Sequence, residues 1–151
     1  MGIDTDIQQN KFLNNYQRAS VNILFTYGWM MEKIKEILEP ADITPQQFNI
    51  LRILRGSHPK PLSTLQIRER MLDKMSDTSR IVDRMIAKGL VNKAISRKDR
   101  RLVDIIISPK GLKLIRKLDS RQRELDEILK NISAKEAATL SKILDKVRKG
   151  S

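Results

Sequence analysis

The side chains most able to do chemistry in this sequence are its basic ones, because the residues that usually carry catalysis are scarce. The 151 residues include one histidine and no cysteine. A disulfide framework, a thiol nucleophile and a cysteine-ligated zinc ion are therefore excluded, as are the usual paired-histidine catalytic and metal sites. No cluster of acid, base and nucleophile is apparent, so we expect no enzyme, no cofactor and no bound metal.

Lysine and arginine supply the remaining chemistry, which is the binding of anions. The chain holds 30 Lys or Arg against 18 Asp or Glu, a net charge of +12. Residues 1–50 have a net charge of −2, residues 51–101 of +9, and residues 102–151 of +5. A local excess of one sign indicates a binding surface more strongly than a diffuse excess does. The middle third is therefore the expected place of contact with an anionic partner.

Residues 75–88 are expected to form a helix with one packed face and one free face. The packed face carries Thr78, Ile81, Val82 and Met85, and the free face carries Ser76, Ser79, Arg80, Asp83 and Arg84. Arg80 and Arg84 have a like-charge spacing that costs an isolated helix roughly 0.2 to 0.5 kcal/mol, and an anionic partner would remove that cost. The alternative is an ordinary solvated face on which Asp77 and Arg80 form an exposed ion pair.

A second basic cluster lies between two β-branched segments, residues 91–95 and 102–107, which predict a hairpin. The hairpin tip contains Arg97, Lys98, Arg100 and Arg101. Long basic side chains on a narrow projection suit the minor groove of DNA and its flanking phosphates. Asp99 has a different use, because a carboxylate can hold an arginine fork by bidentate pairing. The alternative is a basic turn that only keeps an edge hairpin soluble.

Helices must position both clusters, and their starts are marked in the sequence. Thr44, Pro45 and Gln47 combine an N-cap, a proline at the first helical position and a capping-box glutamine, so a helix follows and ends at Gly56. Ser63 and Gln66 predict a second, short helix, over residues 63–72. Two short helices about three residues apart, followed at once by a hairpin, have the order of a winged helix-turn-helix, whose second helix enters the major groove of DNA.

Amphipathic segments flank this central region. Apolar residues at helical spacing predict a long helix over residues 12–38. Ser108 and Pro109 open another helix, whose apolar stripe continues to Ile132, and Ser133 caps a final one. Phe, Tyr and Trp make up only 4% of the chain, so the core must be aliphatic. The expected fold is mainly α with a small β-hairpin wing, a winged helix-turn-helix between N- and C-terminal helices.

Four short segments of this sequence form a spaced combination: Ser-Arg-Ile-Val-Asp-Arg-Met at 79–85, Lys-Gly-Leu-Val at 88–91, Asp-Arg-Arg at 99–101 and Ser-Pro-Lys-Gly at 108–111. The combination resembles the multiple antibiotic resistance regulator (MarR) family of bacterial transcription factors. The resemblance covers nearly the whole chain, because the long first helix, residues 44–48 and the closing helices match in order. Leu72 and Asp77 depart from the family pattern, which often has glycine and a neutral hydroxyl residue there, and the wing lacks its frequent proline.

The resemblance implies a homodimer that binds double-stranded DNA. Residues 1–151 would form one domain, with dimerisation helices at 1–40 and 109–151 and a DNA-binding lobe at 44–108. The residues that match recognition-helix positions are Ser76, Asp77, Ser79, Arg80 and Arg84. Arg101 matches the wing arginine that family members insert into the minor groove, and Asp99 matches the aspartate that steadies it.

The resemblance also implies a pocket for a small aromatic or phenolic effector, near the junction of the dimerisation helices and the DNA-binding lobe. The candidate pocket residues are Tyr16, Tyr27, Trp29 and Phe48. Their spacing is equally that of core residues, so both interpretations stand. Because the chain lacks cysteine, a thiol-based peroxide sensor of the kind found in this family is excluded.

The sequence therefore predicts a dimeric, sequence-specific DNA-binding regulator, acting as a repressor that a small molecule relieves. The alternative is a basic nucleoid-type protein that binds DNA without sequence preference. The longest uncharged stretch, residues 19–31, has 13 residues, short of the roughly 20 needed to span a bilayer. No signal sequence opens the chain, so we expect a cytoplasmic protein without membrane contact.

Overall fold

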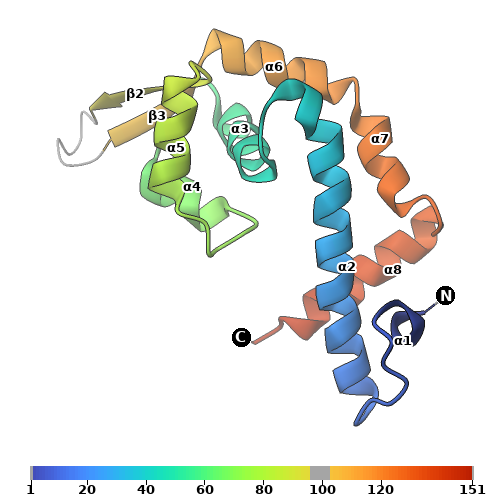
Figure 1. The fold of residues 1–151 in the computed structure, drawn as a ribbon. Helices are drawn as coiled ribbons and strands as arrows, with labels where there is room; N and C mark the ends of the chain where they lie inside the picture. Colours follow the sequence, from blue (N-terminus) through green and yellow to red (C-terminus); the bar gives the residue numbers. More distant parts are fainter. Residues whose placement is uncertain (1, 96–102, 151) are drawn as a thin grey trace.

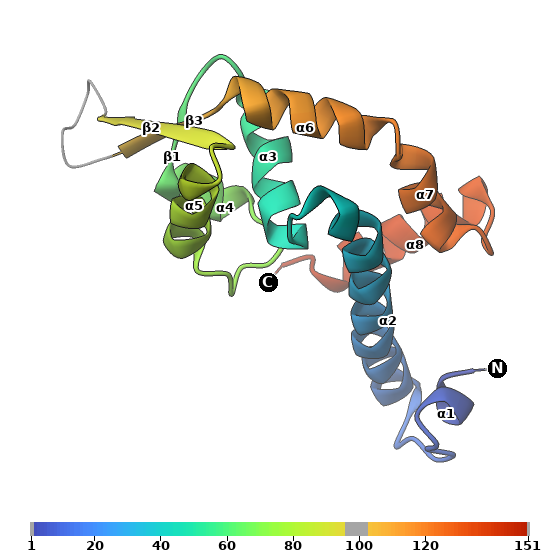
Figure 2. The same cartoon turned by 45° about the horizontal axis from the view of Figure 1, so that its top comes forward.

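The molecule consists of a helical arm and a smaller winged-helix lobe (Figures 1 and 2). One helix runs from the sheet of the lobe to the arm. The structure, a computed structural model, describes residues 2–95 and 103–150. The lobe contains α3 (Pro45–Ser57), β1 (Leu62–Ser63), α4 (Thr64–Arg70), α5 (Thr78–Ala87), β2 (Val91–Ile95) and β3 (Val103–Ile107). The arm contains α1 (Ile3–Asp6), α2 (Asn15–Leu38), α7 (Gln122–Asp126) and α8 (Ala134–Val147). The connecting helix is α6 (Pro109–Asp119), and short 3-10 turns, η1 (Glu39–Ala41) and η2 (Glu127–Leu129), follow α2 and α7.

The arm extends away from the lobe. In Figure 1, α2 runs downward from the lobe, and α6 crosses the top of the molecule from the sheet to α7. The α7 helix packs beside α2, so the two ends of the chain belong to the same arm. No helix of the described residues is both long enough and apolar enough to cross a membrane.

The helix starts that the sequence marks are confirmed. In α3, Gln47 N donates to Thr44 Oγ1 and Thr44 N donates to Gln47 Oε1, both at 3.1 Å. The same reciprocal pair joins Ser63 with Gln66 at the start of α4 and begins α8. Each capping box satisfies two backbone donors that a helix end would otherwise leave unpaired.

The sheet has one strand more than the predicted hairpin. The strand order is β1-β3-β2, antiparallel throughout, with Leu62 opposite Ile105 and Val91 opposite Ile107. The hairpin strands lie where the sequence predicts them. Strand β1 has only two residues, too few for an alternating pattern to reveal it.

The core lies in the lobe and is aliphatic, as the composition predicts. Its most completely buried side chains include Leu51, Leu54, Ile67, Met85, Val91, Ile105 and Ile115, and Phe48 is packed among them. These residues come from helices α3 to α6 and from the sheet, so the hydrophobic effect binds the elements of the lobe to one another and to the connecting helix.

Two glycines hold α5, the sheet and α6 close together. Gly89 has φ +74°, and its N–H and that of Leu90 donate to the carbonyls of Ile86 and Met85, which is the Schellman arrangement that ends a helix. At Gly111, an added Cβ would lie 2.3 Å from the carbonyl oxygen of Leu90. Glycine is therefore required at position 111 for α6 to approach the backbone that precedes β2.

The end of α3 and the course of the helix after Pro109 differ from the sequence prediction. Gly56 does not end α3, which continues to Ser57 with His58 as the C-cap. The single helix predicted to follow Pro109 is broken, because α6 ends at Asp119 and α7 begins three residues later. At the break, Arg121 Nη1 donates to the carbonyl oxygen of Ile37 at 2.5 Å, which ties the bend to the end of α2.

Candidate nucleic-acid interface

Helix α5 is anchored by its apolar face. Thr78, Val82 and Met85 are buried, with Met85 completely so, and Ile81 is half-buried. The helix contacts α3, α4 and β2 through this face. Because these positions recur at helical spacing, burying them fixes how α5 is rotated about its own axis.

The opposite face of α5 is polar and open to solvent, as predicted. Ser79, Arg80, Asp83 and Arg84 are all exposed. Within residues 2–95 and 103–150, the side chains of Arg80 and Arg84 form neither an ion pair nor a hydrogen bond. In particular, Asp77 pairs with the backbone of Arg80 and not with its guanidinium. Two guanidinium groups with unused donors on one helix face can contact phosphates and base edges.

The other two predicted recognition residues lie before the helix, not on it. Helix α5 begins at Thr78 and not near residue 75, and Asp77 is its N-cap, accepting a hydrogen bond from Arg80 N at 3.2 Å. Ser76 is half-buried, and its Oγ has no hydrogen-bond partner among the described residues. The structure thus brings Ser79, Arg80 and Arg84 together and places Ser76 and Asp77 in the preceding turn.

The turn between α4 and α5 is longer than predicted. Helix α4 ends at Arg70, so residues 71–77 separate the helices, compared with about three residues in the prediction. Asn49 of α3 accepts a hydrogen bond from Leu72 N at 2.9 Å, and Asp73 Oδ1 accepts one from Met75 N at 2.9 Å. These side-chain acceptors hold the turn together with its own backbone hydrogen bond, from Ser76 N to the carbonyl oxygen of Asp73.

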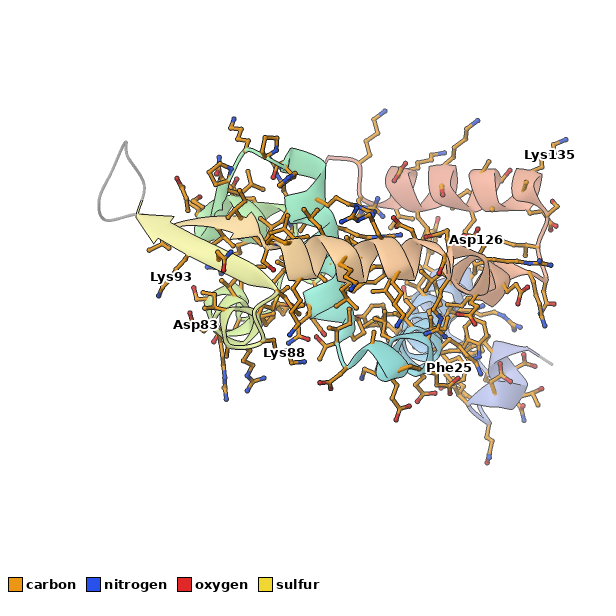
Figure 3. The ribbon with its side chains drawn as sticks, turned by 90° about the horizontal axis from the view of Figure 1, so that it is seen from above. Phe25, Asp83, Lys88, Lys93, Asp126 and Lys135 are labelled. Carbon is orange, nitrogen blue, oxygen red and sulfur yellow. The ribbon has the colours of Figure 1, made fainter. Side chains whose placement is uncertain are left out.

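The wing tip cannot be compared with its prediction. Arg97, Lys98, Asp99, Arg100 and Arg101 lie outside the described residues. The strands that carry the tip are described, and β2 exposes Lys93 near the tip. Figure 3 shows Lys93 and Asp83 at one end of the molecule, far from Asp126 and Lys135 of the arm.

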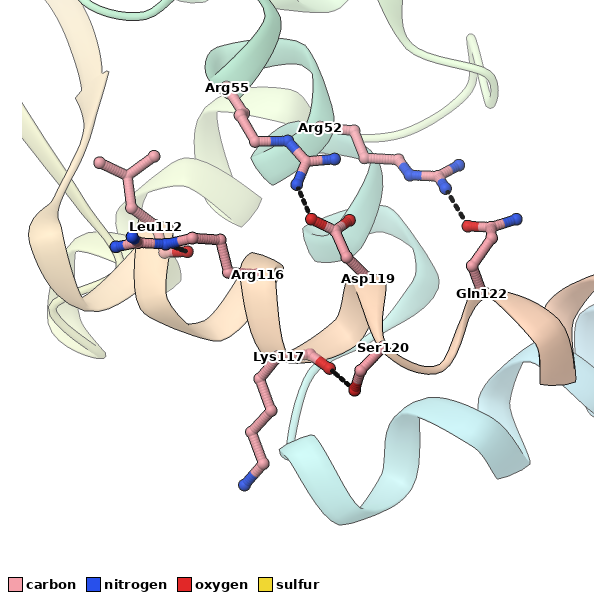
Figure 4. Close-up of polar contacts among 8 residues, drawn as sticks. All are labelled: Arg52, Arg55, Leu112, Arg116, Lys117, Asp119, Ser120 and Gln122. Atoms are coloured by element: carbon pink, nitrogen blue, oxygen red, sulfur yellow. Dashed lines mark hydrogen bonds and ion pairs between the residues drawn. The ribbon is translucent and has the colours of Figure 1, made fainter.

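Two arginines of α3 connect the lobe to the elements that lead into the arm (Figure 4). Arg55 Nη1 lies 2.6 Å from Asp119 Oδ2 at the end of α6, and Arg52 Nη2 donates to Gln122 Oε1 of α7 at 3.0 Å. The Arg52 guanidinium also lies over the Phe48 ring, 4.7 Å from its centroid. Sequence reasoning missed the contacts with Asp119 and Gln122, because these partners are 64 and 70 residues away along the chain.

A cavity of about 390 Å³ lies where α2, α3, the 71–77 turn and α7 meet. Tyr27 and Phe48 line it, as the predicted effector pocket requires, whereas Tyr16 and Trp29 do not. Tyr16 lies near the start of α2, with 85% of its surface exposed, and Trp29 is also exposed. The cavity has further polar and charged lining residues that the sequence did not single out, Arg52, Asp73, Gln122 and Asp126.

In the described part of the chain, no group of three or more His, Asp or Glu side chains is placed to hold a metal ion.

Comparison with known proteins places the chain among transcription regulators. A profile of the MarR family matches residues 41–102. A MarR transcription factor from Planctomyces limnophilus has a similar structure, with 31% identity and a TM-score of 0.68 over 89% of this chain and 98% of that one. A MarR mutant from E. coli, solved in complex with operator DNA, superposes with a TM-score of 0.82 at 24% identity, over 92% and 99% of the two chains. The transcriptional repressor IacR of Pseudomonas putida is 26% identical over 122 residues, which cover 80% of this chain and 72% of IacR.

The N-cap role of Asp77 can be separated from DNA binding by denaturation. Asp77→Ala should lower the free energy of unfolding by about 1 kcal/mol, because Arg80 N loses its acceptor and α5 loses a negative charge at its N-terminus. Asp77→Asn should retain most of that stability, because asparagine is an equally good N-cap. Asp83→Ala, on the exposed face of the same helix, should change the free energy of unfolding by less than about 0.5 kcal/mol. Equal losses from both alanine variants in urea titrations would contradict the N-cap role.

Proposed function

The chain belongs to the MarR family of transcription regulators, and on that basis we propose that it acts as a homodimeric repressor that binds specific double-stranded DNA. A small-molecule effector that weakens DNA binding completes the proposed mechanism. The operator complex of the E. coli relative and the repressor role of IacR support these proposals. A role on bacterial chromosomal DNA would place the protein in the cytoplasm, and it requires no catalytic activity.

The observation that carries the proposal is the free polar face of α5. Arg80 and Arg84 project from a helix whose opposite face is fully engaged in the core. Arginine can donate two hydrogen bonds at once to the O6 and N7 atoms of guanine, which makes it the most frequent reader of bases in the major groove. We assign base reading to Arg80, with Ser79 and Arg84 beside it, and assign contact with the minor groove and its phosphates to Arg101 and the other basic residues of the wing.

Dimerisation through the arm is supported by its exposed apolar surface. Ile23 and Tyr27 of α2 are large apolar residues four positions apart, yet 44% and 55% of their surfaces are exposed in the single chain. On α8, Ile143 and Val147 are similarly exposed, at 54% and 66%. Exposed apolar surface of this extent is typical of a protein interface. Two copies that cover it would place two α5 helices on one DNA duplex, with half-sites about one helical turn apart.

The effector site that we propose is the cavity at the junction of arm and lobe. Its position supports this assignment, because its lining includes residues of both parts, Tyr27 of α2 and Phe48 of α3 among them. A ligand held there would alter how the two lobes of a dimer are placed relative to each other.

A competition experiment separates this function from the alternative of a nucleoid-type protein. A labelled fragment is first selected by the protein from genomic DNA, and then challenged with unlabelled selected or random duplex at about 150 mM salt. A specific regulator should require at least a thousandfold more random DNA for displacement. Equal displacement by both competitors would support the nucleoid-type alternative.

Alanine substitutions should distinguish residues that contact bases from residues that contact the DNA backbone. Arg80→Ala should cost about 1 to 3 kcal/mol on the selected site and little on random DNA, because it removes a base contact. Arg101→Ala should weaken binding to both DNAs more evenly and reduce the slope of affinity against salt concentration. Arg123→Ala is the control, because Arg123 is an exposed arginine of α7 on the arm. The division of roles is wrong if Arg80→Ala and Arg101→Ala give the same loss on every sequence.

The dimer is tested by sedimentation of the wild-type protein and two aspartate variants. Ile143→Asp should weaken association at least about a hundredfold, because the interface would bury an unpaired charge in each subunit. Ala138→Asp makes the same change at an exposed position on another face of α8 and should leave the dimer intact. A wild-type chain that sediments as a folded monomer at micromolar concentration would contradict the proposal.

A further inference from the structure

The cavity between α2, α3, the 71–77 turn and α7 has a charge pattern that identifies the class of its ligand. We propose that this cavity binds an aromatic cation and that Asp73 holds the positive charge, an inference that rests on the effector site of the proposed function. The walls, the charge balance of the lining and the position of Asp73 each bear on this ligand class.

The walls suit a flat, aromatic body. Tyr27, Phe48, Met30 and Met71 line the cavity together with Ile34. Aromatic faces attract cations electrostatically, and methionine side chains are polarisable and adapt to ligands of different shape. A cavity of about 390 Å³ lies within the range of sites that take small organic molecules.

The one basic residue of the lining is already engaged. The lining contains three charged side chains, Arg52, Asp73 and Asp126, so its formal charge is negative. Arg52 donates to Gln122 Oε1 at 3.0 Å, and Gln122 Nε2 donates to Asp126 Oδ1 at 2.9 Å. The amide of Gln122 therefore connects the guanidinium to one of the two carboxylates. Since the guanidinium also lies over the Phe48 ring, it is held against the cavity wall by two contacts.

Neither carboxylate forms an ion pair within the described residues, and Asp73 also lacks the link to Arg52 that Gln122 gives Asp126. Asp73 is half-buried, and its Oδ1 accepts a single hydrogen bond, from Met75 N at 2.9 Å. Among the described residues, no Lys or Arg forms an ion pair with it. The net charge of +12 on the whole chain does not offset this local deficit, because salt screens exposed charges beyond about 8 Å at physiological ionic strength.

Asp73 also links the cavity to the DNA-reading helix. Its side chain accepts a hydrogen bond from Met75 N, and its backbone carbonyl accepts one from Ser76 N. The residue after Ser76 is Asp77, the N-cap of α5. A cation that draws the Asp73 carboxylate into the cavity competes with the hydrogen bond from Met75 N. The occupied cavity therefore acts on the turn that sets the start of α5, which gives the ligand a direct route to DNA affinity.

Calorimetric titration of the full-length protein with three ligands that share one aromatic body tests the proposal. The ligands are a naphthylmethyl trimethylammonium cation, naphthylethanol and naphthylacetate, at about 150 mM salt. The cation should bind at least about tenfold more tightly than the anion. Asp73→Asn should reduce that preference about fivefold or more, because asparagine retains the acceptor for Met75 N and loses only the charge. Glu36→Gln, on the exposed surface of α2, should have no effect.

Tighter binding of naphthylacetate, or unchanged affinity of the cation for Asp73→Asn, would overturn the proposal. DNA affinity is measured separately, with and without the cation, on the selected fragment. Failure of the ligand-free protein to prefer that fragment rejects the proposed regulator, whatever the calorimetry shows. A protein that prefers the fragment and binds the anion more tightly keeps the proposed function and loses this inference.

Discussion

Burial of one face of α5 is the constraint on which the rest of the structure depends. Val82 and Met85 are buried where α5 packs on α3, α4 and β2, so the helix cannot rotate without exposing core side chains. The rotation of the helix in turn fixes Arg80 and Arg84 on the outside, where their guanidinium groups have no partner in the described chain. The charge of these residues does not by itself make a binding surface. Apolar packing holds both arginines on one side of the helix, where they can contact an anion without reorganisation.

Helix α3 contacts both the core of the lobe and the elements that lead into the arm. Its buried residues form the centre of the core, whereas Arg55 and Arg52 contact the end of α6 and the start of α7. Asn49 of the same helix holds the turn before α5 through Leu72 N. A single helix therefore contacts the core, the bend toward the arm and the turn before α5. The cavity that we assign to an effector lies against this helix, where one ligand can contact both the arm and the turn before α5.

Local signals in the sequence were enough to predict most helix starts, because a capping box needs only residues three positions apart. The two hairpin strands followed from equally local rules. The turn between α4 and α5 was predicted too short, because the prediction extended α5 back to Met75, which the structure places in an exposed turn held by Asp73. The contacts of Arg52, the break before α7 and the lining of the cavity depend on partners far away in the chain. Such contacts follow from the folded arrangement and not from spacing, which is why the sequence grouped Tyr16 and Trp29 with Tyr27 and Phe48 although only the latter two line this cavity.

The central claim is that the outer face of α5 enters the major groove of a specific site. The absence of cysteine from the chain allows a direct measurement, because one introduced thiol can carry a DNA-cleaving iron chelate. With Ser79→Cys, on the outer face of α5, the account predicts two clusters of cleavage about one helical turn apart within the selected fragment. With Ala138→Cys, on α8 of the arm, it predicts no cleavage above background. Equal cleavage from both positions, or cleavage from α5 without preferred sites, would contradict the account.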